Sequence, residues 1–98
     1  MSEKEEGAQE SVRIVIFGKV QGVFFRSNLK VIADSLSVTG WTRNVSDGTV
    51  EVVVQGRQED LQRVTDWCKT GPRLARVDKL EIFVINTQER FRNFVVLS

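Results

Sequence analysis

The clearest pattern in the chain is an alternation of apolar and polar positions shortly after its beginning. Residues 12–17 read VRIVIF, in which every second side chain, starting with Val12, lies on one side of an extended strand. The other side starts with Arg13 and then becomes apolar, which is typical of an inner strand covered on at least one face. We expect Gly18 to end this strand.

Two later segments have the apolar period of amphipathic helices. The residues that form the apolar stripes are Phe25, Leu29, Ile32 and Leu36 in the first segment and Leu61, Val64 and Cys68 in the second. The first helix is expected to run to about Ser37. Gly71 and Pro72 should end the second helix, because glycine adopts the left-handed backbone at a helix end and proline cannot continue a helix. Trp41 and Trp67 belong to amphipathic elements, which favours packing over ligand stacking.

Four further strands complete the pattern. They are expected at residues 38–45, 49–55, 77–85 and, as a shorter final strand or edge tail, 91–97. Asp47 and Gly48 supply the backbone dihedrals of a tight hairpin between the first two of them. Glu51 and Lys79 are expected to be ordinary charges on strand faces.

This order of elements, β-α-β-β-α-β with a short last strand, predicts an α+β, ferredoxin-like sandwich. An antiparallel or mixed sheet would carry both helices on one face. In that arrangement the strand before Gly18 and the strand that ends near Asn44 run parallel, with a third strand between them. Their carboxyl ends then lie at the same sheet edge, about 10 Å apart.

Composition limits what the protein can be. A chain of 98 residues forms one domain, which we place at residues 11–98. Residues 1–10 contain four glutamates and one lysine and no apolar period, so they are expected to form a disordered acidic tail. The rest of the chain is therefore more basic than the net charge of +1 suggests, which favours small anions but falls short of a nucleic-acid surface.

The chain contains no histidine and a single cysteine, Cys68. Histidine-activated nucleophiles, histidine metal sites and an internal disulfide are thereby excluded. No apolar run is long enough to cross a membrane and no secretory signal is evident. We therefore expect a cytoplasmic protein without membrane insertion. No cofactor or metal is expected.

The segment GKVQGVFFR, residues 18–26, joins the first strand to the first helix. Gly18 and Gly22 free the backbone to direct its N–H groups at an anion, and Arg26 adds a planar cationic donor within the first helical turn. Lys19 would raise the local potential. The alternative interpretation is a plain strand end and turn followed by a solvated arginine. The spacing fits neither a Walker loop nor a dinucleotide-binding fingerprint.

Together with GWTRN at residues 40–44, the Asp47–Gly48 hairpin and GPRLARVD at 71–78, this segment resembles the acylphosphatase family. The resemblance covers everything except the acidic tail. It implies a small, monomeric, metal-independent hydrolase acting on acid anhydrides, which cleaves acyl phosphates to a carboxylate and inorganic phosphate. Two positions depart from the family pattern, Thr42 and Phe24, and Phe24 could narrow access to the loop.

By position, the resemblance implies that Arg26 and Asn44 are the catalytic residues. The loop residues whose backbone would hold the phosphate are Gly18, Lys19, Val20, Gln21, Gly22 and Val23. Asn44 would orient the attacking water, and a phosphate oxygen of the substrate would accept its proton. The alternative is a non-catalytic ferredoxin-like module that binds an anion or a partner, because fold does not fix function. RNA recognition is disfavoured because strand 49–55 carries no aromatic residue.

Overall fold

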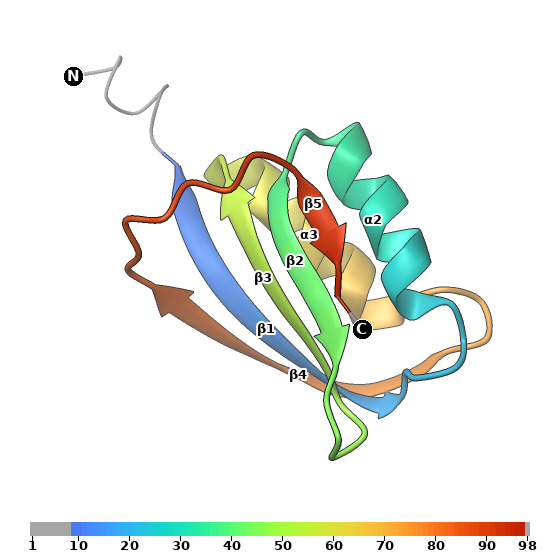
Figure 1. Cartoon of the computed structure of the whole chain (residues 1–98). Helices are drawn as coiled ribbons and strands as arrows, with labels where there is room; N and C mark the ends of the chain where they lie inside the picture. The colour runs from blue at the N-terminus through green and yellow to red at the C-terminus, as the bar shows by residue number, and fades with distance from the viewer. Residues whose placement is uncertain (1–8, 98) are drawn as a thin grey trace.

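A computed structural model describes residues 9–97 as one sheet with two helices packed on one of its faces (Figure 1). The elements are β1 (Glu10–Lys19), α2 (Phe25–Ser35), β2 (Thr39–Asn44), β3 (Val50–Gly56), α3 (Gln58–Thr70), β4 (Arg76–Ile85) and β5 (Phe94–Val96). The predicted α+β, ferredoxin-like order with a short last strand is confirmed. Most of the acidic segment expected at residues 1–10 lies outside the described residues, and β1 already begins at Glu10.

The spatial order of the strands is β4-β1-β3-β2-β5. Strand β3 pairs antiparallel with both β1 and β2, so β1 and β2 run parallel to each other with β3 between them. This is the predicted relationship. The loop that follows β1 and the end of β2 consequently lie at the same edge of the sheet (Figure 1).

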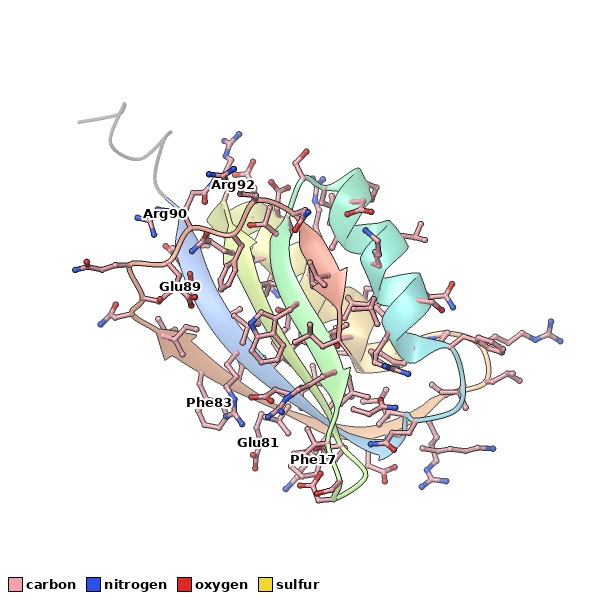
Figure 2. The ribbon with its side chains drawn as sticks, viewed as in Figure 1. Phe17, Glu81, Phe83, Glu89, Arg90 and Arg92 are labelled. Atoms are coloured by element: carbon pink, nitrogen blue, oxygen red, sulfur yellow. The ribbon has the colours of Figure 1, made fainter. Side chains whose placement is uncertain are left out.

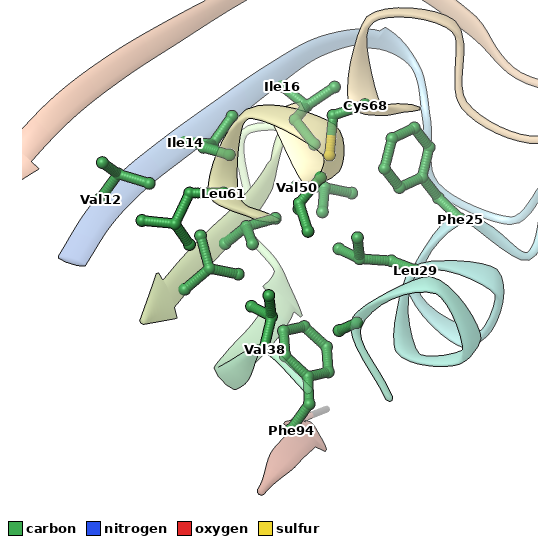
Figure 3. Close-up of a cluster of buried hydrophobic side chains, with 14 of the residues drawn as sticks. Val12, Ile14, Ile16, Phe25, Leu29, Val38, Val50, Leu61, Cys68 and Phe94 are labelled. Carbon is green, nitrogen blue, oxygen red and sulfur yellow. The ribbon is translucent and has the colours of Figure 1, made fainter. Parts of the chain in front are cut away.

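The core lies between the sheet and the two helices (Figure 3). Its fully buried side chains include Ile14 and Ile16 of β1, Phe25 and Leu29 of α2, Val50 and Val52 of β3, Val64 and Cys68 of α3, and Phe94 of β5. The predicted stripe of α3 is confirmed. In α2 the stripe continues from Leu29 to Ala33, whereas Ile32 and Leu36 are only partly buried, because residues four apart follow one ridge of the helix.

Helix α2 ends at Ser35, two residues earlier than expected. Ser37 has a φ of 57°, which is a left-handed backbone that cannot continue the helix. The N–H groups of Ser37 and Val38 donate to the carbonyls of Asp34 and Ala33, and these bonds satisfy the last turn. The chain thereby turns directly into β2. Within residues 9–97, no helix has the length and apolar character needed to cross a membrane.

The sheet face opposite the helices, on which Phe83 lies (Figure 2), carries a charged network that the sequence did not predict. Glu51 is only 7% exposed, and its two carboxylate oxygens accept hydrogen bonds from Arg13 Nε at 2.6 Å and Arg43 Nε at 2.7 Å. Expecting an ordinary surface charge at Glu51 was therefore wrong. Lys79 is exposed as expected, and its Nζ lies 4.6 Å from the ring centre of Phe17.

The short strand β5 pairs in parallel with the outer side of β2. Its Phe94 is fully buried, and the Phe94 carbonyl accepts a hydrogen bond from Lys30 Nζ of α2 at 3.1 Å. Beyond the strand, the N–H of Leu97 donates to the carbonyl of Thr42 at 2.8 Å. These contacts bring residues 94–97 to the sheet edge where the loop after β1 lies.

Candidate active site

The glycine loop begins later than the sequence suggested. Strand β1 does not stop at Gly18 but continues to Lys19, and Gly18 and Lys19 pair with Val77 and Arg76 of β4 across a register shift. Gly18 has a φ of 134°, and a Cβ at this position would lie 2.1 Å from the Arg76 carbonyl oxygen. Glycine is thus required here so that β4 can approach closely.

The connection from β1 to α2 is formed by residues 20–24, and most of its backbone N–H groups have no partner among residues 9–97. Gly22 has a φ of 76° and open space around it, while Val23 is anchored in the core. No acceptor within residues 9–97 is in hydrogen-bonding geometry with the N–H groups of residues 21–24. Among the described residues, helix α2 also lacks a side-chain cap at Phe24, so the N–H groups of its first turn point out of the helix end uncapped. Such an arrangement attracts anions.

A hollow of about 340 Å³ opens at this helix end. It is lined by Val20, Gly22, Phe24, Phe25, Arg26, Ser27 and Val96. Arg26 is the only cationic side chain in that lining, and it lies in the first turn of α2. The hollow therefore combines free backbone donors, a helix N-terminus and one guanidinium, which suits a small anion such as phosphate.

Two bridges connect the loop and the helix to the end of β2. Gln21 Nε2 donates to the carbonyls of Val45 at 2.7 Å and Thr49 at 2.9 Å, which binds the loop to both sides of the β2–β3 hairpin. Arg26 Nη1 donates to the carbonyl of Leu97 at 2.9 Å, and the Leu97 N–H donates to Thr42. The structure thereby brings the loop, Arg26 and the end of β2 together.

Asn44 is the last residue of β2. In the chain it lies between Thr42, which the Arg26–Leu97 bridge reaches, and Val45, which Gln21 reaches. Its Oδ1 is buried and has no hydrogen-bond partner within residues 9–97. Buried polar atoms are nearly always paired, so an unpaired acceptor indicates a site for a water or ligand donor. Asn44 itself does not line the hollow at Arg26.

The hairpin that follows Asn44 is held rigidly. The Thr49 hydroxyl and the Thr49 N–H donate to Asp47 Oδ1 at 2.6 and 3.0 Å, and these bonds lower the pKa of the Asp47 carboxyl. Asp47 therefore stays ionised and fixes the turn. Cys68 has no part in the site, since burial raises the pKa of its thiol to about 12. Residues 9–97 contain no cluster of three histidine, cysteine or acidic residues that could hold a metal.

Sequence reasoning missed the contribution of the segment after Phe94. Val96 lines the hollow, and the Leu97 carbonyl orients Arg26. The apolar residues at positions 94–97 indicated an edge strand, but nothing in them indicated a backbone contact to a side chain on α2. Phe24 also lines the hollow. The prediction that Phe24 narrows access to the loop requires this position.

Three comparisons place these features among known proteins. The family model for Acylphosphatase matches residues 12–96. The Acylphosphatase of Pyrobaculum islandicum is 45% identical over 91 residues, covering 90% of this chain and 96% of the relative, and that of Methylococcus capsulatus is 40% identical over 86 residues, covering 88% and 94%. The structure of an acylphosphatase from Coxiella burnetii superposes with a TM-score of 0.88 at 35% identity, covering 94% of this chain and 96% of that one. On these matches, the chain belongs to the acylphosphatase family.

Proposed function

We propose that this protein hydrolyses acyl phosphates to a carboxylate and inorganic phosphate, with Arg26 and Asn44 as its catalytic residues. The observation that carries the proposal is the meeting of two features at one sheet edge. One is the guanidinium of Arg26 beside an uncapped helix end, and the other is the unpaired, buried Oδ1 of Asn44. The first suits a phosphoryl group, and the second suits a water molecule.

The phosphoryl oxygens would be held by the loop that the sequence placed at residues 18–23. Within this loop the N–H groups of residues 21–23 are the best donors, because Gly18 and Lys19 pair with β4, and the N–H of Phe24 adds a further donor just after the loop. Arg26 would neutralise the charge that develops on these oxygens in the transition state. The Leu97 carbonyl holds the guanidinium through Nη1, so its other N–H groups remain to bind the substrate.

Hydrolysis would proceed by attack of a water molecule on phosphorus. Asn44 Oδ1 accepts one hydrogen bond from this water and aims its oxygen in line with the acyl oxygen that leaves. The new P–O bond forms as the bond to the acyl oxygen breaks, and the carboxylate departs with the bonding electrons. A phosphate oxygen of the substrate accepts the proton of the water, because neither motif contains a histidine or a carboxylate.

We further propose that the enzyme works as a monomer in the cytoplasm. Every group assigned to the reaction comes from one chain, so a second copy adds nothing to the site. The single thiol of Cys68 is free and buried, which suits a reducing compartment.

The test is hydrolysis of benzoyl phosphate, followed by ultraviolet absorbance, with and without a chelator. The unmodified protein should be active, insensitive to the chelator and competitively inhibited by inorganic phosphate. Asn44→Ala should lower kcat by about a hundredfold or more, the usual loss when a transition-state donor or acceptor is removed. Arg26→Lys keeps the charge but loses the planar fork, and should weaken phosphate inhibition as well as kcat.

The matched control is Asn86→Ala, which removes an exposed asparagine just after β4. It should leave kcat and KM unchanged. An unchanged rate in Asn44→Ala would refute the role of Asn44. A protein that fails to hydrolyse benzoyl phosphate, or needs a divalent metal to do so, would refute the proposed function.

A further inference from the structure

A second hollow of about 470 Å³ adjoins the one at Arg26. It is lined by Val23, Phe24, Asn28, Trp67, Pro72, Arg73 and Leu74. The start of α2, the end of α3 and the loop that follows α3 surround it, and these segments lie side by side (Figure 1). Phe24 lines both hollows, so its side chain borders each of them.

Phe24 has an unusual backbone. Its φ of 66° is left-handed, which an aromatic residue adopts only under constraint. The Phe24 carbonyl accepts hydrogen bonds from Asn28 N at 3.2 Å, Asn28 Nδ2 at 2.8 Å and Ser27 Oγ at 3.3 Å, which tie this residue to the first turn of α2. The Phe24 side chain is 69% exposed. Strained residues of this kind cluster at ligand sites.

Most of the other residues that line the second hollow are apolar, namely Val23, Trp67, Pro72 and Leu74, while Asn28 and Arg73 add one polar and one charged side chain. Leu74 is 60% exposed, and Trp67 packs its ring edge to face with Phe25, with ring centres 5.2 Å apart, while it also lines the hollow. Exposed apolar side chains that converge on one concavity indicate a binding surface rather than scattered surface residues. A volume of this size suits a small molecule.

We propose that the second hollow is the acyl subsite of the enzyme, and that it selects acyl phosphates with an aromatic or branched hydrocarbon group. This inference rests on the proposed function. The phosphoryl group binds at Arg26, the acyl chain crosses the ring of Phe24, and its hydrocarbon end packs on Leu74 and Trp67. Small acyl groups such as acetyl reach only as far as Phe24, so they make no contact with the second hollow and do not bind more tightly because of it.

The experiment compares kcat/KM for benzoyl phosphate and acetyl phosphate in two variants. Leu74→Ser removes an apolar wall at an exposed position, and Phe24→Asn replaces the ring with a residue that tolerates the left-handed backbone. Leu74→Ser should lower kcat/KM for benzoyl phosphate about fivefold to tenfold, mainly through KM, and change that for acetyl phosphate less than about twofold. Because Phe24 also lines the hollow at Arg26, Phe24→Asn is judged only by the ratio of the two kcat/KM values, which should fall for benzoyl phosphate relative to acetyl phosphate. Inhibition by inorganic phosphate should stay the same in Leu74→Ser.

The matched control is Val31→Ser, because Val31 is an exposed apolar residue of α2 that lines neither hollow. It should leave the ratio of the two kcat/KM values unchanged. An equal loss for both substrates in Leu74→Ser, or an unchanged ratio in both variants, would overturn the acyl subsite while leaving the proposed function intact. If the unmodified protein hydrolyses neither substrate, the proposed function fails and the subsite fails with it.

Discussion

Replacing Gly18 by alanine tests whether this glycine is needed for the approach of β4. The new Cβ would lie 2.1 Å from the Arg76 carbonyl oxygen and 2.8 Å from the Asp78 nitrogen. Both are backbone atoms, so the two strands must move apart, at a cost of about 1–3 kcal/mol. The φ of 134° adds strain of about 1–2 kcal/mol in any residue with a Cβ. We therefore expect Gly18→Ala to lower the free energy of unfolding by about 3–4 kcal/mol.

Gly22→Ala is the matched control, because Gly22 has a left-handed φ of 76° but no atom within 4 Å of the point that a Cβ would occupy. Strain alone predicts a loss of about 1 kcal/mol. Urea denaturation of both variants, followed by tryptophan fluorescence and extrapolated linearly, measures the two losses. If Gly18→Ala destabilises the protein no more than Gly22→Ala, the argument from close approach is refuted.

Two further predictions concern buried ionisable groups. Burial alone would raise the pKa of the Glu51 carboxyl, but the hydrogen bonds and charges of Arg13 and Arg43 outweigh it and hold this pKa below its usual 4.5. The stabilisation is thus complete above that value and is lost as the pH falls through the folded pKa. Glu51→Gln should lower the free energy of unfolding by about 2 kcal/mol at neutral pH. In urea titrations at acidic pH, the difference in this free energy between the variant and the unmodified protein should shrink. A difference that does not change with pH would contradict the charged network. The Cys68 thiol, with a pKa of about 12, should react with Ellman's reagent only after unfolding in urea, and rapid reaction of the folded protein would disprove its burial.

The helices and strands could be predicted from the sequence because each depends mainly on residues that are close together in the chain. Alternation in β1, the period of α3 and the Asp47–Gly48 turn each depend on residues close in sequence, and all three are found in the structure. The parallel relation of β1 and β2 followed from the element order alone. This parallel relation alone predicts that Asn44 lies at the same sheet edge as the loop after β1, because it depends on the backbone topology and not on any side-chain contact.

Other features depend on partners that are distant in sequence and leave no local trace. Glu51 reads as a surface charge within β3, and only its pairing with Arg13, 38 residues earlier, shows why it is buried. From the sequence Gly18 is predicted to end a strand, and only the close approach of β4 shows why a residue without a Cβ is needed there. The Leu97 carbonyl that holds Arg26 is a backbone group, and residue type says nothing about what it binds.

Strand β5 has a consequence for the sheet as a whole. It occupies the outer edge of β2 at Gly40, Trp41 and Thr42, so the middle of this edge is already paired and is not available to another strand. An uncovered edge of this kind is a template on which another chain can add a strand. A variant truncated before Phe94 would therefore lose Val96 from the lining of its site and would also expose the unpaired edge of β2. We would expect intermolecular β-sheet formation at this edge to compete with refolding.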